Sequence, residues 1–131
     1  MGKVGVLLGD NQETIQARVR SILCEDFVVV GTVGNGRDAI TEVGRLDPDV
    51  LVIDISMPVL DGLQAASRLH RKGCRTKVVF LTVHEDRDYV DAAFAAGASG
   101  YVTKSHITSD LVPAIREALI GHMYISKSIK P

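Results

Sequence analysis

The feature that most constrains the fold of this chain is an unbroken apolar run at residues 50–53, which ends in one acidic residue, Asp54. An apolar run rich in β-branched side chains is typical of a strand buried on both faces of a parallel sheet. Pro58 cannot continue a central strand, and Asp61 and Gly62 are turn residues. The pattern therefore predicts a lone carboxylate at the carboxyl end of a central strand, where open α/β sheets bind their ligands.

Four further apolar runs alternate with segments of helical period. The predicted strands are residues 3–9, 27–33, 50–53, 76–82 and 99–103, and the predicted helices are residues 13–25, 37–46, 63–71, 86–96 and 111–120. This alternation predicts βαβ units with right-handed crossovers and a parallel sheet. Because Pro113 lacks the N–H that binds the carbonyl four residues earlier, we expect the last helix to start late, near Ser109, or to be distorted there.

Composition bounds the class of protein. A chain of 131 residues, 46% hydrophobic and 24% charged, is expected to form one globular domain. The net charge of −1 gives no sign that this chain binds nucleic acid or an anionic membrane. Cys24 and Cys74 form no CxxC pair, so we expect reduced thiols, with Cys24 partly buried beside a helix. We see no signal peptide or membrane-spanning run, and we therefore expect a cytoplasmic domain.

The predicted strand ends bring polar side chains to one edge of the sheet. Asp10 and Asn11 follow the first strand, Asp54 follows the third, Thr82 ends the fourth and Lys104 follows the fifth. Two carboxylates at short distance favour a bound cation or a shifted pKa, and hard oxygen ligands suit Mg²⁺. A hydroxyl and an ammonium suit the charge of a phosphoryl group. The set therefore predicts a site where Asp54 accepts a phosphoryl group with help from a metal ion.

Each of these residues also has a purely structural interpretation. Asp10 is suited to cap a helix, Thr82 to end a strand, and Lys104 to neutralise Asp54 in an ion pair. Five such residues at equivalent strand ends favour the functional interpretation.

With these motifs in view, the sequence resembles the receiver domain of two-component response regulators over residues 3–120. The motifs that carry the resemblance are VLLGDN, DVLVIDISMPVLDG, VVFLT and SGYVTKS, while AIREALIGHMYIS resembles the LuxR-type (NarL/FixJ-like) transcriptional regulators. The resemblance implies a flavodoxin-like (CheY-like) fold of five parallel strands in the order 2-1-3-4-5, with five helices on both faces. It also implies a receiver at residues 1–121, and at residues 122–131 the start of a linker to a helix-turn-helix domain.

The same resemblance implies the chemistry. A sensor histidine kinase would pass a phosphoryl group to Asp54, with Mg²⁺ held by Asp10, Asn11, Asp54 and the backbone carbonyl of Ser56. Lys104 would contact the phosphoryl oxygens. The domain would not be an enzyme beyond self-catalysed phosphotransfer and autodephosphorylation.

The resemblance further implies a switch. Thr82 and Tyr101 would move towards the phosphoryl group. His84 lies at a position that tunes dephosphorylation in the family, and the equally weighted alternative is an exposed loop residue without such a role. The face made by the fourth helix, fifth strand and fifth helix would then change. A homodimer on phosphorylation is implied, with the stripe at residues 86–96 and the last helix as candidate surfaces. DNA would be bound only through a further C-terminal domain, and no membrane is implied.

Asn11 departs from the family pattern, which usually has a second acid at this position. Asparagine keeps a carbonyl oxygen but lacks the negative charge. Two unit charges ~4 Å apart interact by about 4 kcal/mol at an effective dielectric of roughly 20, so we expect weaker Mg²⁺ binding and slower phosphorylation. The alternative is a pseudo-receiver, weakly phosphorylated or independent of phosphorylation, that acts as a protein-interaction module.

Two other classes fit the residues less well. A phosphohydrolase of the haloacid-dehalogenase kind needs a second acid two residues after the nucleophile, where this chain has Ser56. A flavodoxin-like cofactor carrier needs a phosphate loop rich in Ser, Thr and Gly after the first strand, and GDNQET is too acidic for that role.

Overall fold

The computed structural model describes residues 3–23 and 25–129, which form six strands and five helices. The strands are β1 (Val4–Gly9), β2 (Phe27–Val33), β3 (Val50–Ile53), β4 (Lys77–Thr82), β5 (Gly100–Thr103) and β6 (Tyr124–Ile125). The helices are α1 (Glu13–Ile22), α2 (Gly36–Leu46), α3 (Gly62–Arg71), α4 (Arg87–Ala95) and α5 (Ile107–Leu119), and a short 3-10 helix, η1 (Lys104–His106), precedes α5. None of the described helices is long and apolar enough to cross a membrane.

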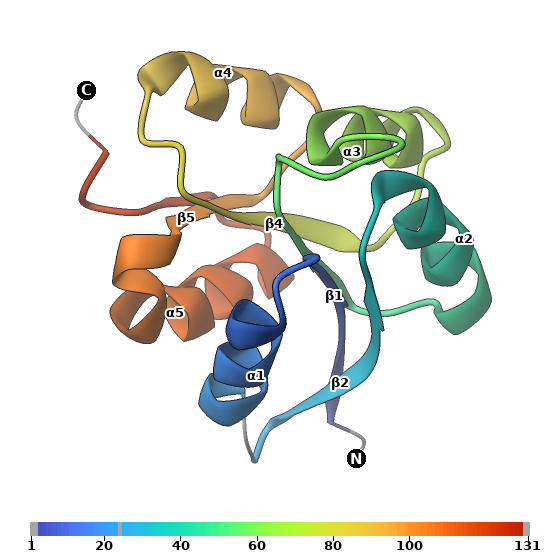
Figure 1. The fold of residues 1–131 in the computed structure, drawn as a ribbon, viewed down its shortest axis with the longest axis horizontal. Coiled ribbons are helices and arrows are strands. Elements are labelled where there is room, and N and C mark those ends of the chain that lie inside the picture. The colour runs from blue at the N-terminus through green and yellow to red at the C-terminus, as the bar shows by residue number, and fades with distance from the viewer. Residues whose placement is uncertain (1–2, 24, 130–131) are drawn as a thin grey trace.

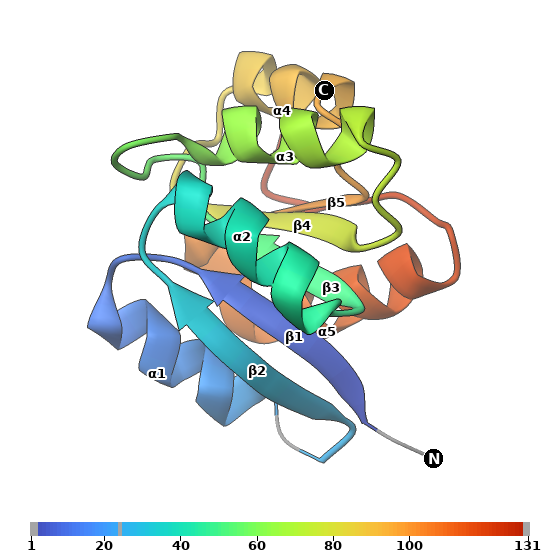
Figure 2. The same cartoon turned by 90° about the vertical axis from the view of Figure 1, so that its right-hand side faces the viewer.

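The strands form one parallel sheet in the order β2-β1-β3-β4-β5-β6. Helices α1 and α5 cover one face, and α2, α3 and α4 cover the other (Figure 1; Figure 2). Each face has its own apolar cluster. All four residues of β3 are fully buried, as the unbroken apolar run predicts. The predicted flavodoxin-like α/β fold and the order of its first five strands are confirmed.

The sheet has six strands, and the prediction of five is therefore wrong in number. After α5 the chain turns at Gly121, with φ of 85°, and returns beside β5. Tyr124 and Ile125 pair in parallel with Gly100 and Tyr101. A strand of two residues is too short to show the alternation that identifies a strand in a sequence. Residues predicted to begin a linker thus extend the sheet, and whether a linker follows stays a prediction.

Helix α5 starts at Ile107, two residues before the expected start near Ser109, and Pro113 lies inside it. Ile107 is fully buried against the sheet, and η1 leads directly into the first turn. Burial of this side chain holds the early turn, although the proline removes one hydrogen bond from the helix. Helix α1 ends at Ile22, and the expectation for Cys24 lies outside the described residues. Cys74 is a half-buried free thiol.

Two features fix the segment between β3 and α3. Asp61 caps α3, with its side chain accepting from the Gln64 N–H while the Gln64 side chain accepts from the Asp61 N–H. Gly62, the first residue of α3, packs so tightly that a Cβ there would lie 2.1 Å from the carbonyl oxygen of Asp54. The turn expected at Asp61 and Gly62 is therefore a capped helix start that rests against the backbone of the central acidic residue.

Candidate functional site

The ammonium of Lys104 holds the strand ends together. Its Nζ atom lies 2.9 Å from Oδ2 of Asp54, 2.9 Å from Oδ2 of Asp10 and 3.0 Å from Oε1 of Gln12. Asp54 follows β3, Asp10 follows β1 and Lys104 follows β5, so one long side chain reaches two neighbouring strands from across β4. The side chains of Asp10, Asp54 and Lys104 are 1%, 8% and 8% exposed, which makes this a nearly dry cluster.

The charges of this cluster do not cancel. Burial lowers the pKa of Lys104, but its ionic contacts with Asp10 and Asp54 raise it by more, so the pKa lies above its usual value. Lys104 is therefore protonated at neutral pH. One ammonium faces two carboxyl groups, and two carboxylates beside a single cation favour a further cation at the same place.

Asp10 supplies a buried oxygen without a hydrogen bond. Its Oδ1 accepts from the N–H of Gln12 at 2.8 Å, but its Oδ2 has no hydrogen-bond donor among the described residues. The Lys104 ammonium is near this oxygen, yet its aligned hydrogen bonds go to Asp54 and Gln12. Asp10 Oδ2 is thus a buried carboxylate oxygen held by its ion pair with Lys104, and such an oxygen is suited to bind a cation.

The residues present fit a hard divalent cation, with fewer acids than a dedicated metal cage. Asp10 and Asp54 offer carboxylate oxygens, the ligands that Mg²⁺ prefers together with water. Asn11 is exposed, and no hydrogen bond or ion pair joins it to either acid within the described ranges. No group of three or more His, Cys, Asp or Glu side chains suited to a metal occurs in that part of the chain. The pocket thus offers two carboxylates, those of Asp10 and Asp54, to a cation.

A second set of contacts lies beside the acids, in the loops after β3 and β4. The Ser56 hydroxyl and the His84 Nε2 atom are 2.9 Å apart, and the His84 ring stacks on Tyr89 with centroids separated by 4.0 Å. Thr82 is fully buried, and its hydroxyl accepts from the His84 N–H at 3.3 Å. The Tyr101 hydroxyl donates to the His84 carbonyl at 2.9 Å. His84 therefore connects both loops to β5.

These contacts locate each predicted site residue. Asp10, Asp54 and Lys104 meet directly, as the strand-end argument predicts. Thr82 ends β4 at the same edge, paired in register with Thr103, but no hydrogen bond joins it to Asp54 in the described part of the chain. Ser56 lies near Asp54 through its backbone N–H, 3.4 Å from Oδ1. Of the predicted switch residues, Thr82 and Tyr101 each make a hydrogen bond with His84.

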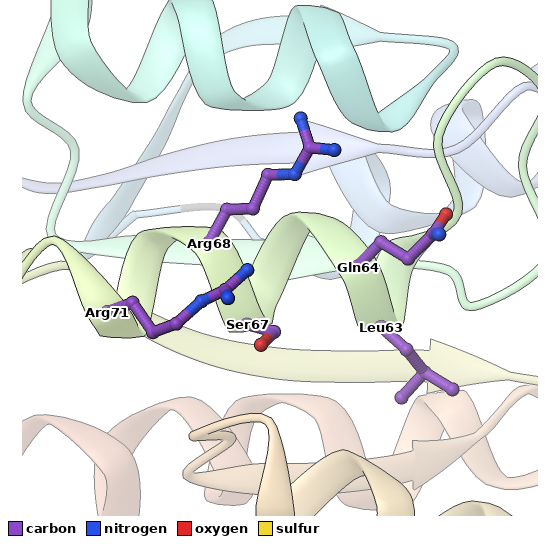
Figure 3. A pocket seen from close by; sticks show the side chains of 5 residues that line it. All are labelled: Leu63, Gln64, Ser67, Arg68 and Arg71. Carbon is purple, nitrogen blue, oxygen red and sulfur yellow. The ribbon is translucent and has the colours of Figure 1, made fainter.

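The sequence argument missed Gln12, whose side chain holds the Lys104 ammonium and whose N–H holds Asp10. Its place two residues after the strand-end acid is a signal, because an acidic side chain there commonly accepts from the N–H two residues on. Surface hollows give no help in finding the site. Two hollows of about 280 and 380 Å³ lie along α3, and both are lined in part by Arg68 and Arg71; Figure 3 shows the first. Neither is lined by a strand-end residue.

Comparison with known proteins decides the family. The family described as response regulator receiver domain matches residues 6–116. The chain belongs to the response regulator receiver domain family. This receiver is 35% identical over 128 residues to the transcriptional regulatory protein YvfU of Bacillus subtilis, covering 96% of this chain and 64% of that protein. It is 34% identical to the response regulator UvrY of Escherichia coli, covering 96% of this chain and 59% of the relative.

A similar solved structure belongs to the same class of protein as these relatives, the response regulators. A two-component response regulator of the LuxR family from Aurantimonas sp. superposes on this receiver with a TM-score of 0.91 at 27% identity, covering 98% of this chain and 93% of the other. The predicted resemblance to LuxR-type receivers is confirmed, and the family is not one of classical enzymes. The chain spans about three fifths of the length of the curated relatives it matches, 64% and 59%.

Proposed function

We propose that this receiver accepts a phosphoryl group on Asp54 from a phosphohistidine of a sensor histidine kinase. The observation that carries the proposal is the contact of Lys104 with Asp54 and Asp10 in a nearly dry pocket at the strand ends. In the transfer, the P–N bond of the phosphohistidine breaks and a P–O bond forms to a carboxylate oxygen of Asp54. The transferred group brings negative charge, which a protonated lysine already in place stabilises.

Each residue of the pocket has a part in this proposal. Asp10 and Asp54 would hold Mg²⁺, with the backbone carbonyl of Ser56 and the amide oxygen of Asn11 as further oxygen ligands. When bound, the ion would neutralise charge on the phosphoryl oxygens. Lys104, already beside Asp54, would contact the phosphoryl oxygens. The hydroxyl of Thr82 leaves the His84 N–H for the same group, and Tyr101 follows.

The downstream part of the proposal concerns the whole regulator. Relatives such as YvfU are described as transcriptional regulatory proteins and are longer than this chain. We infer that the phosphorylated receiver forms a homodimer and controls a DNA-binding domain that is separate from it.

The test is phosphorylation by a small donor. The protein is incubated with Mg²⁺ and acetyl phosphate, and its intact mass is measured. We expect a gain equal to one phosphoryl group, which is absent from Asp54→Asn and abolished by EDTA. A gain that persists in Asp54→Asn would show that another residue is modified.

One observation favours the alternative of a pseudo-receiver. Asn11 is exposed and uncharged, and among the described residues the pocket offers a cation the two carboxylates of Asp10 and Asp54. In that case the intact mass stays unchanged at millimolar Mg²⁺ in the wild type but increases in Asn11→Asp. This result would assign the chain to phosphate-independent binding of a protein partner.

A further inference from the structure

The C-terminal segment, residues 122–129, is docked on the edge of the sheet beside β5. The Tyr124 N–H donates to the Ser99 carbonyl at 3.1 Å, and the Ser126 N–H donates to the Tyr101 carbonyl at 2.9 Å. Ile129 is 8% exposed and belongs to the same apolar cluster as Tyr101. The segment therefore covers a strand edge that would otherwise present unpaired backbone groups.

A buried carboxylate on α5 holds this segment. Asp110 is 6% exposed; its Oδ2 accepts from the Ser126 hydroxyl at 2.6 Å, and its Oδ1 accepts from the Tyr124 hydroxyl at 2.9 Å and from the Ser109 hydroxyl at 3.3 Å. Hydrogen bonds to an ionised acceptor are about twice as strong as neutral ones. Asp110 plays no part in the strand-end pocket, so its burial needs another explanation, and docking of the C-terminal segment supplies it.

The same segment contacts the strand that leads to the pocket. The Thr103 N–H donates to the Ser126 hydroxyl at 3.1 Å, and the hydroxyls of Thr103 and Ser128 are 3.0 Å apart. Thr103 directly precedes Lys104, whose ammonium binds Asp54. Tyr101, whose hydroxyl binds the loop after β4, pairs with Ile125. Two residues of β5, Tyr101 and Thr103, thus connect the segment to the strand that leads to the pocket.

We propose that the C-terminal segment is a detachable sixth strand, docked by Asp110 and loosened when Asp54 is phosphorylated. The first half of this proposal, docking by Asp110, is based on the contacts above. The second half, loosening on phosphorylation, rests on the proposed function. A phosphoryl group on Asp54 replaces the present contact between Asp54 Oδ2 and the Lys104 ammonium, and the adjustment of Lys104 displaces Thr103, the residue before it, which binds Ser126. Movement of the Tyr101 ring disturbs the apolar cluster that contains Ile129 and against which Ile125 packs. The edge of β5 then loses its partner strand, and phosphorylation of Asp54 changes the conformation of residues 122–129.

Hydrogen exchange of the 131-residue protein, followed by mass spectrometry, tests the docking half. We expect Asp110→Asn and Ser126→Ala to speed exchange in residues 122–129 by about tenfold or more, while β1 and β3 stay protected. Asp88→Asn and Ser21→Ala, at exposed positions, serve as matched controls and should leave the segment protected. Unchanged exchange in both Asp110→Asn and Ser126→Ala would show that Asp110 does not dock the segment. Loss of protection in β1 and β3 as well would show that the variants loosen the whole sheet and not the segment alone.

The loosening half is tested in the same samples with Mg²⁺ and acetyl phosphate, with the intact mass measured in parallel. In molecules that gain a phosphoryl group, exchange in residues 122–129 should increase about tenfold over the unmodified protein. A mass gain with unchanged or slower exchange would overturn the loosening while leaving the proposed function intact. No mass gain in the wild type, even after Asn11→Asp, would overturn the proposed function and with it the loosening, but not the docking.

Discussion

Lys104 and Asp54 are joined across β4 by an ion pair of 2.9 Å, and the same ammonium lies 2.9 Å from Asp10. A lysine placed between two buried acids does two things at once. It lowers the repulsion between the carboxylates, and it places a positive charge where an added phosphoryl group would lie. Lys104 can therefore both neutralise the two acids in the folded protein and stabilise a phosphoryl group. Variants of Lys104 measure how much the first role contributes to stability.

Replacing Lys104 by methionine keeps the length of the side chain but leaves Asp10 and Asp54 without their cation. Loss of one partner of a buried ion pair costs about 3 kcal/mol in the free energy of unfolding. Urea denaturation in EDTA measures this loss, and Mg²⁺ should restore part of it by replacing the missing charge. Lys127→Met, at an exposed position, is the control and should change stability by less than about 0.5 kcal/mol. Equal stability of wild type and Lys104→Met would contradict the ion pair.

Asn11→Asp should tighten Mg²⁺ binding by about tenfold. A unit charge ~4 Å from a divalent ion is worth about 2 kcal/mol in a water-like dielectric, and Asn11 is exposed, so screening reduces the gain. Isothermal titration with MgCl₂ gives the two dissociation constants, and high salt should reduce their difference. Ser21→Asp, at an exposed position near the end of α1, adds the same charge away from the pocket and should leave the affinity unchanged. Equal affinities for wild type and Asn11→Asp would contradict the expected weakness of this site.

Gly62→Ala should disturb the acceptor directly. A Cβ at this position would lie 2.1 Å from the Asp54 carbonyl oxygen, so the loop after β3 must move. Overpacking of this kind costs about 3 kcal/mol in stability. Gly44→Ala is the matched control, because nothing lies within 4 Å of a Cβ there and alanine inside α2 should stabilise by roughly 0.5–1 kcal/mol. Urea denaturation that gives both variants the same sign of change would refute the close approach.

Much of this fold could be predicted because its inner strands β3, β4 and β5 are buried on both faces. The run at residues 50–53 and the acid after it identify a central strand and its ligand end without any contact information. The convergence of Asp10, Asp54 and Lys104 follows from parallel strands alone. Strand β6 and the docking of Ser126 on Asp110 could not be predicted, because a two-residue strand has no periodicity and a hydroxyl–carboxylate pair 16 residues apart leaves no pattern.

Tyr101→Phe should cost about 1 kcal/mol, the usual net value of one hydrogen bond, because it removes the donor to the His84 carbonyl. Burial, above all, raises the pKa of Tyr101, so the neutral phenol is the form present in the folded protein at neutral pH. Tyr89→Phe is the comparison, since it keeps the ring that stacks on His84 and removes a hydroxyl that makes no hydrogen bond with the described residues. Thermal denaturation should place Tyr101→Phe below Tyr89→Phe, and the opposite order would exclude the His84 contact as a source of stability.

Tyr124 makes the free energy of unfolding fall at alkaline pH. Burial first, and then the hydrogen bond to Asp110 and its negative charge, raise the pKa of Tyr124 to about 12 in the folded chain. An unfolded tyrosine ionises near pH ~10, so between these values the unfolded chain loses its proton first and becomes relatively more stable. The contribution is fully present below about pH 10 and is lost as the pH rises towards 12. Because the side chain is partly exposed, we expect the contribution of Tyr124 to stability to amount to about 1 kcal/mol.

Urea denaturation at about pH 9 and about pH 11 should therefore give a smaller loss of stability for Tyr124→Phe than for the wild type. Asp110→Asn should reduce the loss in the same way, and Asp88→Asn should not. An identical loss in Tyr124→Phe and wild type would show that the phenol is not held by the buried carboxylate.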